Sequence, residues 1–287
     1  MNAVLGPLAA ASGVAPGVSM LALRTPTLPP ATHTNAYLVG TGELVLVEPA
    51  SPYPAEIAQA SAWVEARLAE KQTLRAVLLT HHHADHIGGA EAMRAHFGVP
   101  IWAHERTAQR LAGKVAIDRL LADGERIELD GPTPMVLEAI HTPGHAPGHL
   151  CFYEPASRSL IAGDMVASVG TILVEPVDGD MQLYLASLRA LAARQASQLL
   201  PAHGLPIEDP AARLAFYVQH RLNREAKILA ALSACTAPAS FDELVPVAYA
   251  DTAPAAWSLA RMVLEAHLIK LQREGKVAAH GERWVAA

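Results

Sequence analysis

The run from Thr80 to Gly89 constrains this chain most, because His81-His82-His83-Ala84-Asp85-His86 crowds metal-binding side chains into one short stretch. Imidazole and carboxylate are the groups that Zn²⁺ and similar divalent ions bind. The apolar run 76–79 before it is typical of a buried strand, and two glycines after it let a helix begin close to the backbone. A tag-like tract would lie at a terminus and would lack the Asp-His-x-Gly-Gly sequel. The run therefore predicts a metal-binding turn at the carboxyl end of a strand, where α/β proteins place their sites.

The order of residues in the run suggests two positions for metal. His81 and His83 alternate and can face one way, whereas Asp85 and His86 turn to serve a second position. His82 stands between two ligands and should point the opposite way, so we expect it to be structural or to support the site from behind.

The pattern His-x-His-x-Asp-His resembles the metal-binding signature of the metallo-β-lactamase superfamily, and later segments are similar to the rest of that signature. Residues 142–149 match the Thr-Pro-Gly-His-x-x-Gly-His loop and supply His145. Asp164 follows the apolar run 160–163 and matches a Gly-Asp that provides a bridging carboxylate. His203 lies in a Pro-x-His-Gly that matches the last ligand position. These motifs are also similar to those of glyoxalase II.

The resemblance implies a centre with two divalent ions bridged by a carboxylate and by water or hydroxide. The positions that match the family's ligands are His81, His83 and His145 for the first metal, Asp85, His86 and His203 for the second, and Asp164 as the bridge. Two cations about 3.5–4 Å apart lower the pKa of the bridging water, and the resulting hydroxide attacks a carbonyl or phosphoryl centre. Asp85 is the expected catalytic residue, because it can both ligate and orient the hydroxide. Cysteine is absent from these positions, so we expect zinc, with manganese and iron as alternatives.

Three nearby residues have weaker assignments. His149 resembles a family residue that does not bind metal, and both support of the ligands and simple packing remain open for it. His141 has no assigned role, and we expect its ring nitrogens only to form ordinary hydrogen bonds. Cys151 lies in an apolar strand and is most simply a buried free thiol.

The chain divides near residue 210 into a domain 1–210 and a domain 211–287. In the first, short apolar runs alternate with helical spacing, and the resemblance implies an α/β architecture, the αββα metallo-β-lactamase sandwich. The predicted strands are 18–23, 36–39, 44–47, 76–79, 100–103, 135–137, 150–153 and 160–163, and the predicted helices are 54–71 and 180–193.

The second domain has the pattern of helices followed by a hairpin, which resembles a small winged-helix domain. Its predicted elements are a long helix 211–232, a short helix 241–245 capped around Ser240, a helix 255–274 and a hairpin within 275–285. With this tail, nearly the full chain is similar to the beta-lactamase-like protein 2 group. One departure is Glu48-Pro49-Ala50, where the family usually has Asp-Thr-Gly or Asp-Pro-Gly, and it affects the surroundings of the ligands rather than the ligands.

Composition limits the partners. The chain carries 22 Lys and Arg against 28 Asp and Glu, a net charge of −6. Residues 217–287 contain eight basic and seven acidic residues and residues 1–216 contain 14 and 21, so neither part shows the basic face that nucleic-acid binding needs. A local patch of Lys270, Arg273, Lys276 and Arg283 is explained as well by a solvated helix face. We favour packing, a homodimer contact or a roof over the active site as the role of the winged-helix-like domain.

The location expected from the sequence is the cytoplasm. Two cysteines in 287 residues form no disulfide framework. Residues 1–23 are apolar but lack a basic start and are interrupted by glycine and proline, which favours a loose leader over a signal peptide or a membrane span. We therefore expect no membrane partner.

The predicted function is a metal-dependent hydrolase of a small ester-like substrate, namely a thioester, a lactone or a carboxylic ester. The alternative is a single-stranded endoribonuclease or another phosphodiesterase, because relatives in the group that this chain resembles include endoribonucleases. Hydrolysis of β-lactams is open as a side activity. A regulatory protein with a vestigial site is disfavoured because every ligand position is filled.

Overall fold

The structure is a computed structural model that describes residues 11–287. Residues 1–10 of the predicted leader lie outside the described residues. The described chain forms two compact units. The first comprises residues 11–142, 148–171 and 195–210, and the second comprises residues 143–147, 172–194 and 211–287.

The first unit contains a seven-stranded sheet in which the strands follow their order in the chain. The first four strands pair antiparallel, whereas β4 to β7 pair parallel, so the carboxyl ends of the parallel strands share one edge. The strands are β1 Ser12–Ala15, β2 Val18–Arg24, β3 His33–Val39, β4 Glu43–Val47, β5 Thr73–Leu78, β6 Ile101–His104 and β7 Arg119–Leu121.

The second sheet of this unit has five strands in the order β12-β11-β10-β9-β8. Only the β11–β12 pair is parallel among these strands, so those two also end at one edge. The strands are β8 Arg126–Leu129, β9 Met135–His141, β10 Leu150–Glu154, β11 Ser159–Gly163 and β12 Gln198–Pro201.

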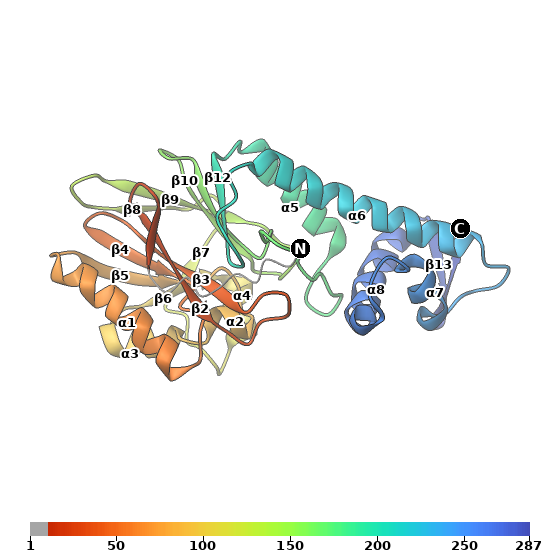
Figure 1. Ribbon diagram of the computed structural model, residues 1–287, viewed down its shortest axis with the longest axis horizontal. Helices are drawn as coiled ribbons and strands as arrows, with labels where there is room; N and C mark the ends of the chain where they lie inside the picture. Colours follow the sequence, from red (N-terminus) through yellow and green to blue (C-terminus); the bar gives the residue numbers. More distant parts are fainter. Residues whose placement is uncertain (1–10) are drawn as a thin grey trace. The chain divides into compact units, whose positions relative to one another are not determined.

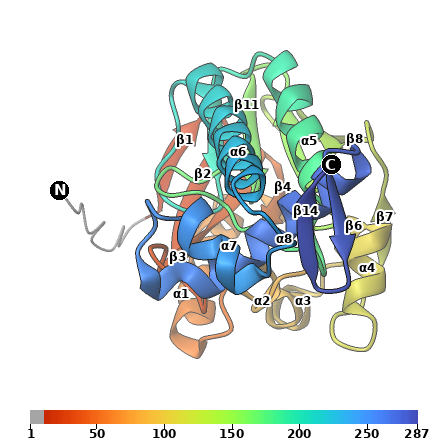
Figure 2. The ribbon, with the colours of Figure 1, turned by 90° about the vertical axis from the view of Figure 1, so that its right-hand side faces the viewer.

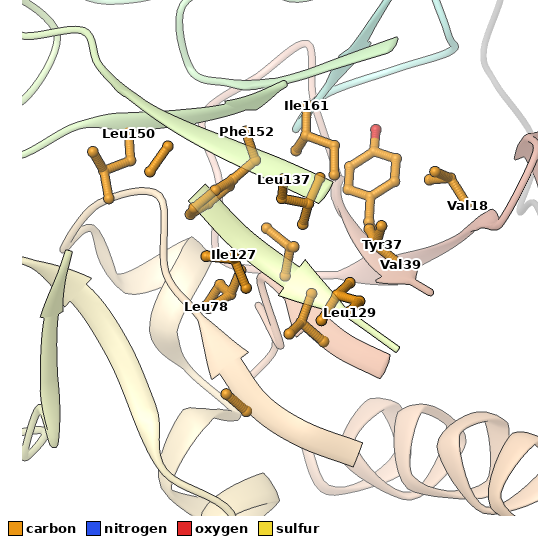
Figure 3. Close-up of a cluster of buried hydrophobic side chains, with 14 of the residues drawn as sticks. Val18, Tyr37, Val39, Leu78, Ile127, Leu129, Leu137, Leu150, Phe152 and Ile161 are labelled. Atoms are coloured by element: carbon orange, nitrogen blue, oxygen red, sulfur yellow. The ribbon is translucent and has the colours of Figure 1, made fainter. Parts of the chain in front are cut away.

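The core of the first unit lies between the two sheets (Figure 3). Tyr37 from the first sheet and Phe152 from the second belong to this layer, and both side chains are fully buried. Truncation of such an aromatic side chain to alanine costs about 3–5 kcal/mol. Side chains alternate along β4 and enter two cores. Val45 and Val47 face the second sheet, whereas Leu44 and Leu46 face the helices.

Helices cover the outer face of the first sheet, which Figure 1 shows with α1 and α3 along the red-to-yellow strands. Ala60 and Val64 of α1 are buried against this face, as are Ala90 and Met93 of α3. The helices of the first unit are α1 Pro54–Ala69, α2 Ala84–Ile87, α3 Ala90–Phe97 and α4 Glu105–Leu111.

The second unit is mainly helical and ends in a hairpin, and Figure 2 shows α7, α8 and the hairpin close together. Their apolar side chains form one core with the carboxyl half of α6, including Ile228, Leu264 and Trp284. The predicted cap at Ser240 is confirmed as a reciprocal capping box with Glu243. The elements are α5 Met181–Ala193, α6 Pro210–Ser233, α7 Phe241–Ala248, the 3₁₀ turn Pro254–Ala256, α8 Trp257–Arg273, β13 Val277–His280 and β14 Arg283–Ala286.

Candidate metal centre

The histidine-rich run forms a tight turn between β5 and α2. His81 and His83 lie in the extended segment after β5, and Asp85 and His86 lie in the single turn of α2. The two glycines that follow are required by close packing. A Cβ on Gly88 would lie 2.5 Å from the backbone nitrogen of Pro52, and one on Gly89 would lie 2.6 Å from the carbonyl oxygen of Pro49. The run thus has its predicted place at the carboxyl edge of the parallel strands.

Asp164 and His203 reach the same region from the second sheet. Asp164 is the first residue after β11, and His203 follows β12, the parallel neighbour of β11. The end of β12 is held by β3, because Asn35 Nδ2 and the Tyr37 hydroxyl both donate to the Pro201 carbonyl, at 2.9 and 2.7 Å. Parallel strands that end together therefore deliver both side chains to one edge.

The four side chains of the predicted second metal position and the bridge converge closely. Asp164 presents Oδ1 at 3.2 Å from His203 Nε2 and Oδ2 at 3.6 Å from His86 Nε2. Asp85 lies opposite, with Oδ1 at 3.8 Å from His86 Nε2 and Oδ2 at 3.7 Å from His203 Nε2. Each carboxylate therefore faces both imidazoles with different oxygen atoms, an arrangement that suits a shared cation.

His81 and His83 form a second pair of nitrogens beside this group. His81 Nε2 lies 2.9 Å from His83 Nδ1, and the rings of His81 and His86 have their centroids 4.0 Å apart. The opposite nitrogen of His81 lies 2.9 Å from the hydroxyl oxygen of Thr80, which orients the ring. Two imidazole nitrogens aimed at one point are typical of ligands for one metal ion.

His145 lies in the loop 143–147, which belongs to the second unit. Its Nδ1 donates to the Leu173 carbonyl at 2.8 Å, which orients the ring and leaves Nε2 as the basic nitrogen of the neutral imidazole. The preceding Gly144 adopts φ = 135°, and a Cβ there would lie 2.2 Å from the backbone nitrogen of Tyr184. The backbone of this loop is bound by α5, whose Ser187 donates to the Pro143 carbonyl.

His149 supports Asp164 from behind. It is fully buried, its Nε2 accepts a 3.0 Å hydrogen bond from the Asp164 amide, and its Nδ1 lies 2.8 Å from the Thr142 hydroxyl oxygen. Gly163 permits this contact, because its φ is 48° and a Cβ would come within 2.5 Å of His149 Nε2. Of the two roles left open by the sequence, support of a predicted ligand is the one that this geometry shows.

Two other residues of the region have structural roles. His141 stacks on His104 with ring centroids 4.1 Å apart. Cys151 is a buried free thiol, as predicted, and burial raises its pKa to about 12. The raised pKa keeps the Cys151 thiol protonated at neutral pH, which disfavours reaction at its sulfur.

Glu48 is a residue of the centre to which the sequence assigned no role. Its side chain is buried, its Oε1 accepts a 2.7 Å hydrogen bond from the Thr80 amide, and its Oε2 contacts His86 Nδ1. The available signals were its acidic side chain in an otherwise apolar segment and its position where the family usually has Asp.

The electrostatics of the centre are those of a cation site. Burial lowers the pKa of His86, but Glu48, Asp164 and Asp85 together raise it well above the ordinary value. Burial likewise lowers the pKa of His203, yet Asp164 raises it overall. The pKa of Asp164 is held well below its usual range by these two histidines, although burial opposes the shift. Positive charge is thus strongly favoured between these carboxylates.

One buried nitrogen tests whether a divalent metal fits. His86 is fully buried, and within residues 11–287 its Nε2 has no hydrogen-bond partner. A ligand atom from each of Asp85, His86 and His203 lies within 4.8 Å of the others. A buried polar atom without a partner is costly unless something else satisfies it. Nitrogen and carboxylate donors aimed at the same point suit zinc and similar ions.

The basic residues of the winged-helix-like segment are engaged with acids. Lys270 is buried and pairs with Glu225 at 2.8 Å and Glu274 at 2.7 Å, so it is not part of a surface patch. Further pairs of this segment include Arg273 with Asp180, Lys276 with Glu274, Arg283 with Glu243 and Arg261 with Asp242. These pairs reduce the positive charge available for phosphate groups.

In the part of the chain that the structure describes, no helix has the length and apolar character needed to cross a bilayer.

Comparison with protein families gives two matches that follow the order of the chain. Residues 29–203 match the metallo-beta-lactamase superfamily, and residues 240–284 match the beta-lactamase associated winged helix domain. Both matches confirm the resemblance and the fold class predicted from the motifs.

Three curated relatives are similar over most of the chain. The lactamase-like protein vrtG of Penicillium aethiopicum is 34% identical over 242 residues, covering 81% of this chain and 71% of its own length. An atrochrysone carboxyl ACP thioesterase of Aspergillus chevalieri is 32% identical, and the match covers 69% of this chain but only 60% of that protein. The beta-lactamase-like protein 2 homolog of Caenorhabditis elegans is 29% identical, with 85% and 80% covered.

A solved structure supports the same architecture. The metallo-beta-lactamase family protein TTHA1429 of Thermus thermophilus superposes with a TM-score of 0.76 at 26% identity. The superposition covers 96% of this chain and 100% of that protein, so the likeness extends over both units.

Proposed function

The chain belongs to the metallo-beta-lactamase superfamily and is a hydrolase, and we propose that it uses two divalent metal ions to hydrolyse a small thioester. The observation that carries the proposal is that the predicted ligands of the first unit form two groups. In one, His81 Nε2 lies 2.9 Å from His83 Nδ1; in the other, ligand atoms of Asp85, His86 and His203 lie within 4.8 Å of one another. Two sets of nitrogen and oxygen donors are suited to hold two cations, and the Asp164 carboxylate is proposed as the bridge between them.

The proposed ligand sets follow the geometry of the first unit. Asp85, His86 and His203 would hold one metal, His81 and His83 would contribute to the other, and Asp164 would serve both. We propose zinc as the metal, because all these donors are nitrogen or oxygen; manganese and iron suit the same donor set.

His145 is proposed as the third histidine beside His81 and His83. The residues that flank its loop, Thr142 and Gly148, both belong to the first unit. Because an extended chain spans at most about 3.3–3.6 Å per residue, His145 lies within about 11 Å of each flanking residue. Thr142 contacts His149, which in turn holds Asp164, so the loop begins beside the ligands of the first unit.

Bound at these positions, two cations supply an activated water as the nucleophile and positive charge beside the developing oxyanion. Asp85 is proposed to orient that water with one carboxylate oxygen and to accept its proton. His149 and the His33 carbonyl, which accepts from His203 Nδ1 at 2.9 Å, keep Asp164 and His203 in place during the attack. Fixed ligands limit the reorganisation that accompanies the reaction.

A thioester suits this site for a chemical reason. Water adds to the carbonyl carbon, the carbon–sulfur bond breaks, and the products are a carboxylic acid and a thiol. A thiol has an ordinary pKa of about 8.5, so the thiolate leaves at neutral pH with little need for a proton donor. Support also comes from the relatives, two of which carry the printed names atrochrysone carboxyl ACP thioesterase and thioesterase pkgB. The net charge of −6 and the paired basic residues favour a small substrate over a polyanion.

The test is a substrate panel with metal-loaded protein at two ionic strengths. The panel contains an acyl thioester of N-acetylcysteamine, an aryl ester, a lactone and a short single-stranded RNA. We expect the thioester to have the highest kcat/KM, with a KM that hardly changes with salt, and we expect activity to disappear in Asp164→Asn. Efficient RNA cleavage that falls steeply with salt would overturn the proposal, because such a slope reports contacts to phosphates.

A further inference from the structure

Glu48 occupies an unusual backbone conformation for its residue type. It follows β4 with φ = 61°, in the left-handed region that favours glycine. Its side chain is only 1% exposed. A buried carboxylate in a disfavoured conformation persists where the surrounding structure holds it through strong contacts.

The contacts of Glu48 connect two parts of the metal-binding turn. Oε1 accepts from the Thr80 amide at 2.7 Å, immediately before the first predicted ligand. Oε2 contacts Nδ1 of His86, at the other end of the run. One side chain therefore fixes the start of the turn and the ring of its last histidine.

The ring of His86 is oriented so that its other nitrogen faces the carboxylates. Nε2 lies 3.8 Å from Asp85 Oδ1 and 3.6 Å from Asp164 Oδ2. A neutral imidazole has one N–H and one lone pair, and the partner of the first nitrogen decides which atom can bind metal. A carboxylate beside Nδ1 can only accept a hydrogen bond, so the proton stays on Nδ1 and the lone pair remains on Nε2.

We infer that Glu48 is a positioning residue for the second metal position: its carboxylate keeps the proton of His86 on Nδ1 and presents the Nε2 lone pair toward Asp85 and Asp164. The inference rests on the proposed two-metal site. Partners of this kind orient metal-binding histidines, and their removal typically weakens metal binding by about 10–100-fold.

Glu48→Gln is the most informative variant, because an amide cannot accept hydrogen bonds at both ends. The Thr80 amide requires the amide oxygen, so the NH₂ group is turned to His86 Nδ1. Nδ1 must then accept, and the proton moves to Nε2, the atom that should bind metal. The variant keeps the size of the side chain while reversing the tautomer.

Two further variants separate this role from other effects. Glu48→Gly relaxes the backbone at φ = 61° but removes the carboxylate, so a role limited to backbone shape predicts unchanged metal binding. Glu43→Gln is the matched control. It removes a carboxylate at the opposite end of β4 that contacts Arg75 and the Asp130 amide.

The experiment is calorimetric titration of zinc into the metal-free wild-type protein and the three variants, with ring ¹⁵N–¹H NMR of the zinc-loaded forms. We expect two zinc ions in the wild type and in Glu43→Gln. In Glu48→Gln and Glu48→Gly we expect the affinity of one zinc to fall by about 10–100-fold while the other changes less than about threefold. The wild type should also show an Nδ1–H proton on His86 that Glu48→Gln lacks.

The outcomes distinguish this inference from the proposal beneath it. Two zinc ions in the wild type with the same two affinities in Glu48→Gln would overturn the role of Glu48 and leave the two-metal site intact. Absence of the Nδ1–H proton in the zinc-loaded wild type would also overturn it, because Glu48 would then bind metal directly or not direct the ring. A wild type that binds a single zinc would overturn the two-metal proposal, and this inference with it.

Discussion

His149 accepts a 3.0 Å hydrogen bond from the backbone amide of Asp164, so a histidine outside the predicted ligand set holds the residue proposed to bridge the metals. His149→Leu removes the acceptor. A buried amide left without a partner costs about 1–3 kcal/mol of folding free energy. We also expect metal affinity to fall by about 10–100-fold. Urea unfolding of the metal-free protein and a chelator competition titration measure the two effects.

His149→Gln tests the hydrogen-bond acceptor at this position, and His141→Phe is the control at another histidine. Glutamine places an oxygen near the position of the imidazole Nε2 and should recover most of the metal affinity. His141→Phe retains an aromatic ring on His104 and should leave metal affinity unchanged. An equal loss in all three variants would mean that the region responds to any substitution and that the hydrogen bond has no special role.

Asp85→Asn should abolish most of the turnover. The substitution keeps the size of the side chain but removes the charge that faces His86 and His203. General-base catalysis alone contributes typically about 10²–10⁴-fold, and weaker metal binding adds to the loss. The measurement is kcat together with elemental analysis of the same sample. Turnover close to that of the wild type at unchanged metal content would show that another group orients the nucleophile.

Metal uptake should depend steeply on pH. Asp164 and its neighbours raise the pKa values of His86 and His203, so in the metal-free protein these rings still hold protons at pH values where a free histidine has lost them. Below the raised pKa values a metal must displace these protons, and its affinity falls as pH falls; above them the affinity levels off. Zinc titrations in buffers of different ionisation enthalpy measure the protons released. Uptake without proton release at neutral pH would contradict this assignment of charge.

The second unit should lose stability in acid through Glu225 and His267. Burial raises the pKa of Glu225, but His267 and Lys270 together lower it to about 2, and burial lowers the pKa of His267 to about 4. Both folded-state values lie below the unfolded ones, so the unfolded chain binds more protons and stability falls as pH falls. The loss from His267 runs from about 6.5 to 4, and that from Glu225 from about 4.5 to 2.

Glu225→Gln tests the pair that produces this behaviour. The variant leaves the buried Lys270 ammonium without its buried carboxylate partner, and breaking a buried pair in this way costs about 3–5 kcal/mol. Glu282→Gln, at an exposed position of the terminal hairpin, is the control and should change stability by less than about 0.5 kcal/mol. Urea unfolding at pH 7, followed by circular dichroism, provides the comparison. A small effect in Glu225→Gln would show that Glu274 alone compensates the charge of Lys270.

The sequence predicted the elements whose signals are local. The apolar runs became strands β2 to β6 and β9 to β11 with ends shifted by a few residues, and the cap at Ser240 is present with Glu243 as its partner. The short edge strands β1, β7, β8 and β12 and the helix α4 were not predicted, and the helix expected after Gly89 had no predicted bounds. Three or four residues such as Arg119–Leu121 are too few to establish a period, and pairing with a neighbouring strand decides their conformation.

What the sequence missed in the centre depends on contacts between distant residues. Glu48 reaches His86 across 38 positions of the chain, so local pattern identifies an acidic residue but not its partner. Lys270 looked like part of a solvated face because its binding partner Glu225 is 45 positions away. The ligand motifs themselves were recognisable because each is a compact signature that lies at the end of an apolar run.

Gly163 has a consequence for how this protein can vary. One added methyl group at that position would sit 2.5 Å from the imidazole nitrogen of His149, in a backbone conformation that L-residues rarely adopt. The ring would have to move, and the amide that it holds would move with it. Among chains descended from this one, the loops around the centre can therefore diversify, whereas residue 163 has room for hydrogen alone.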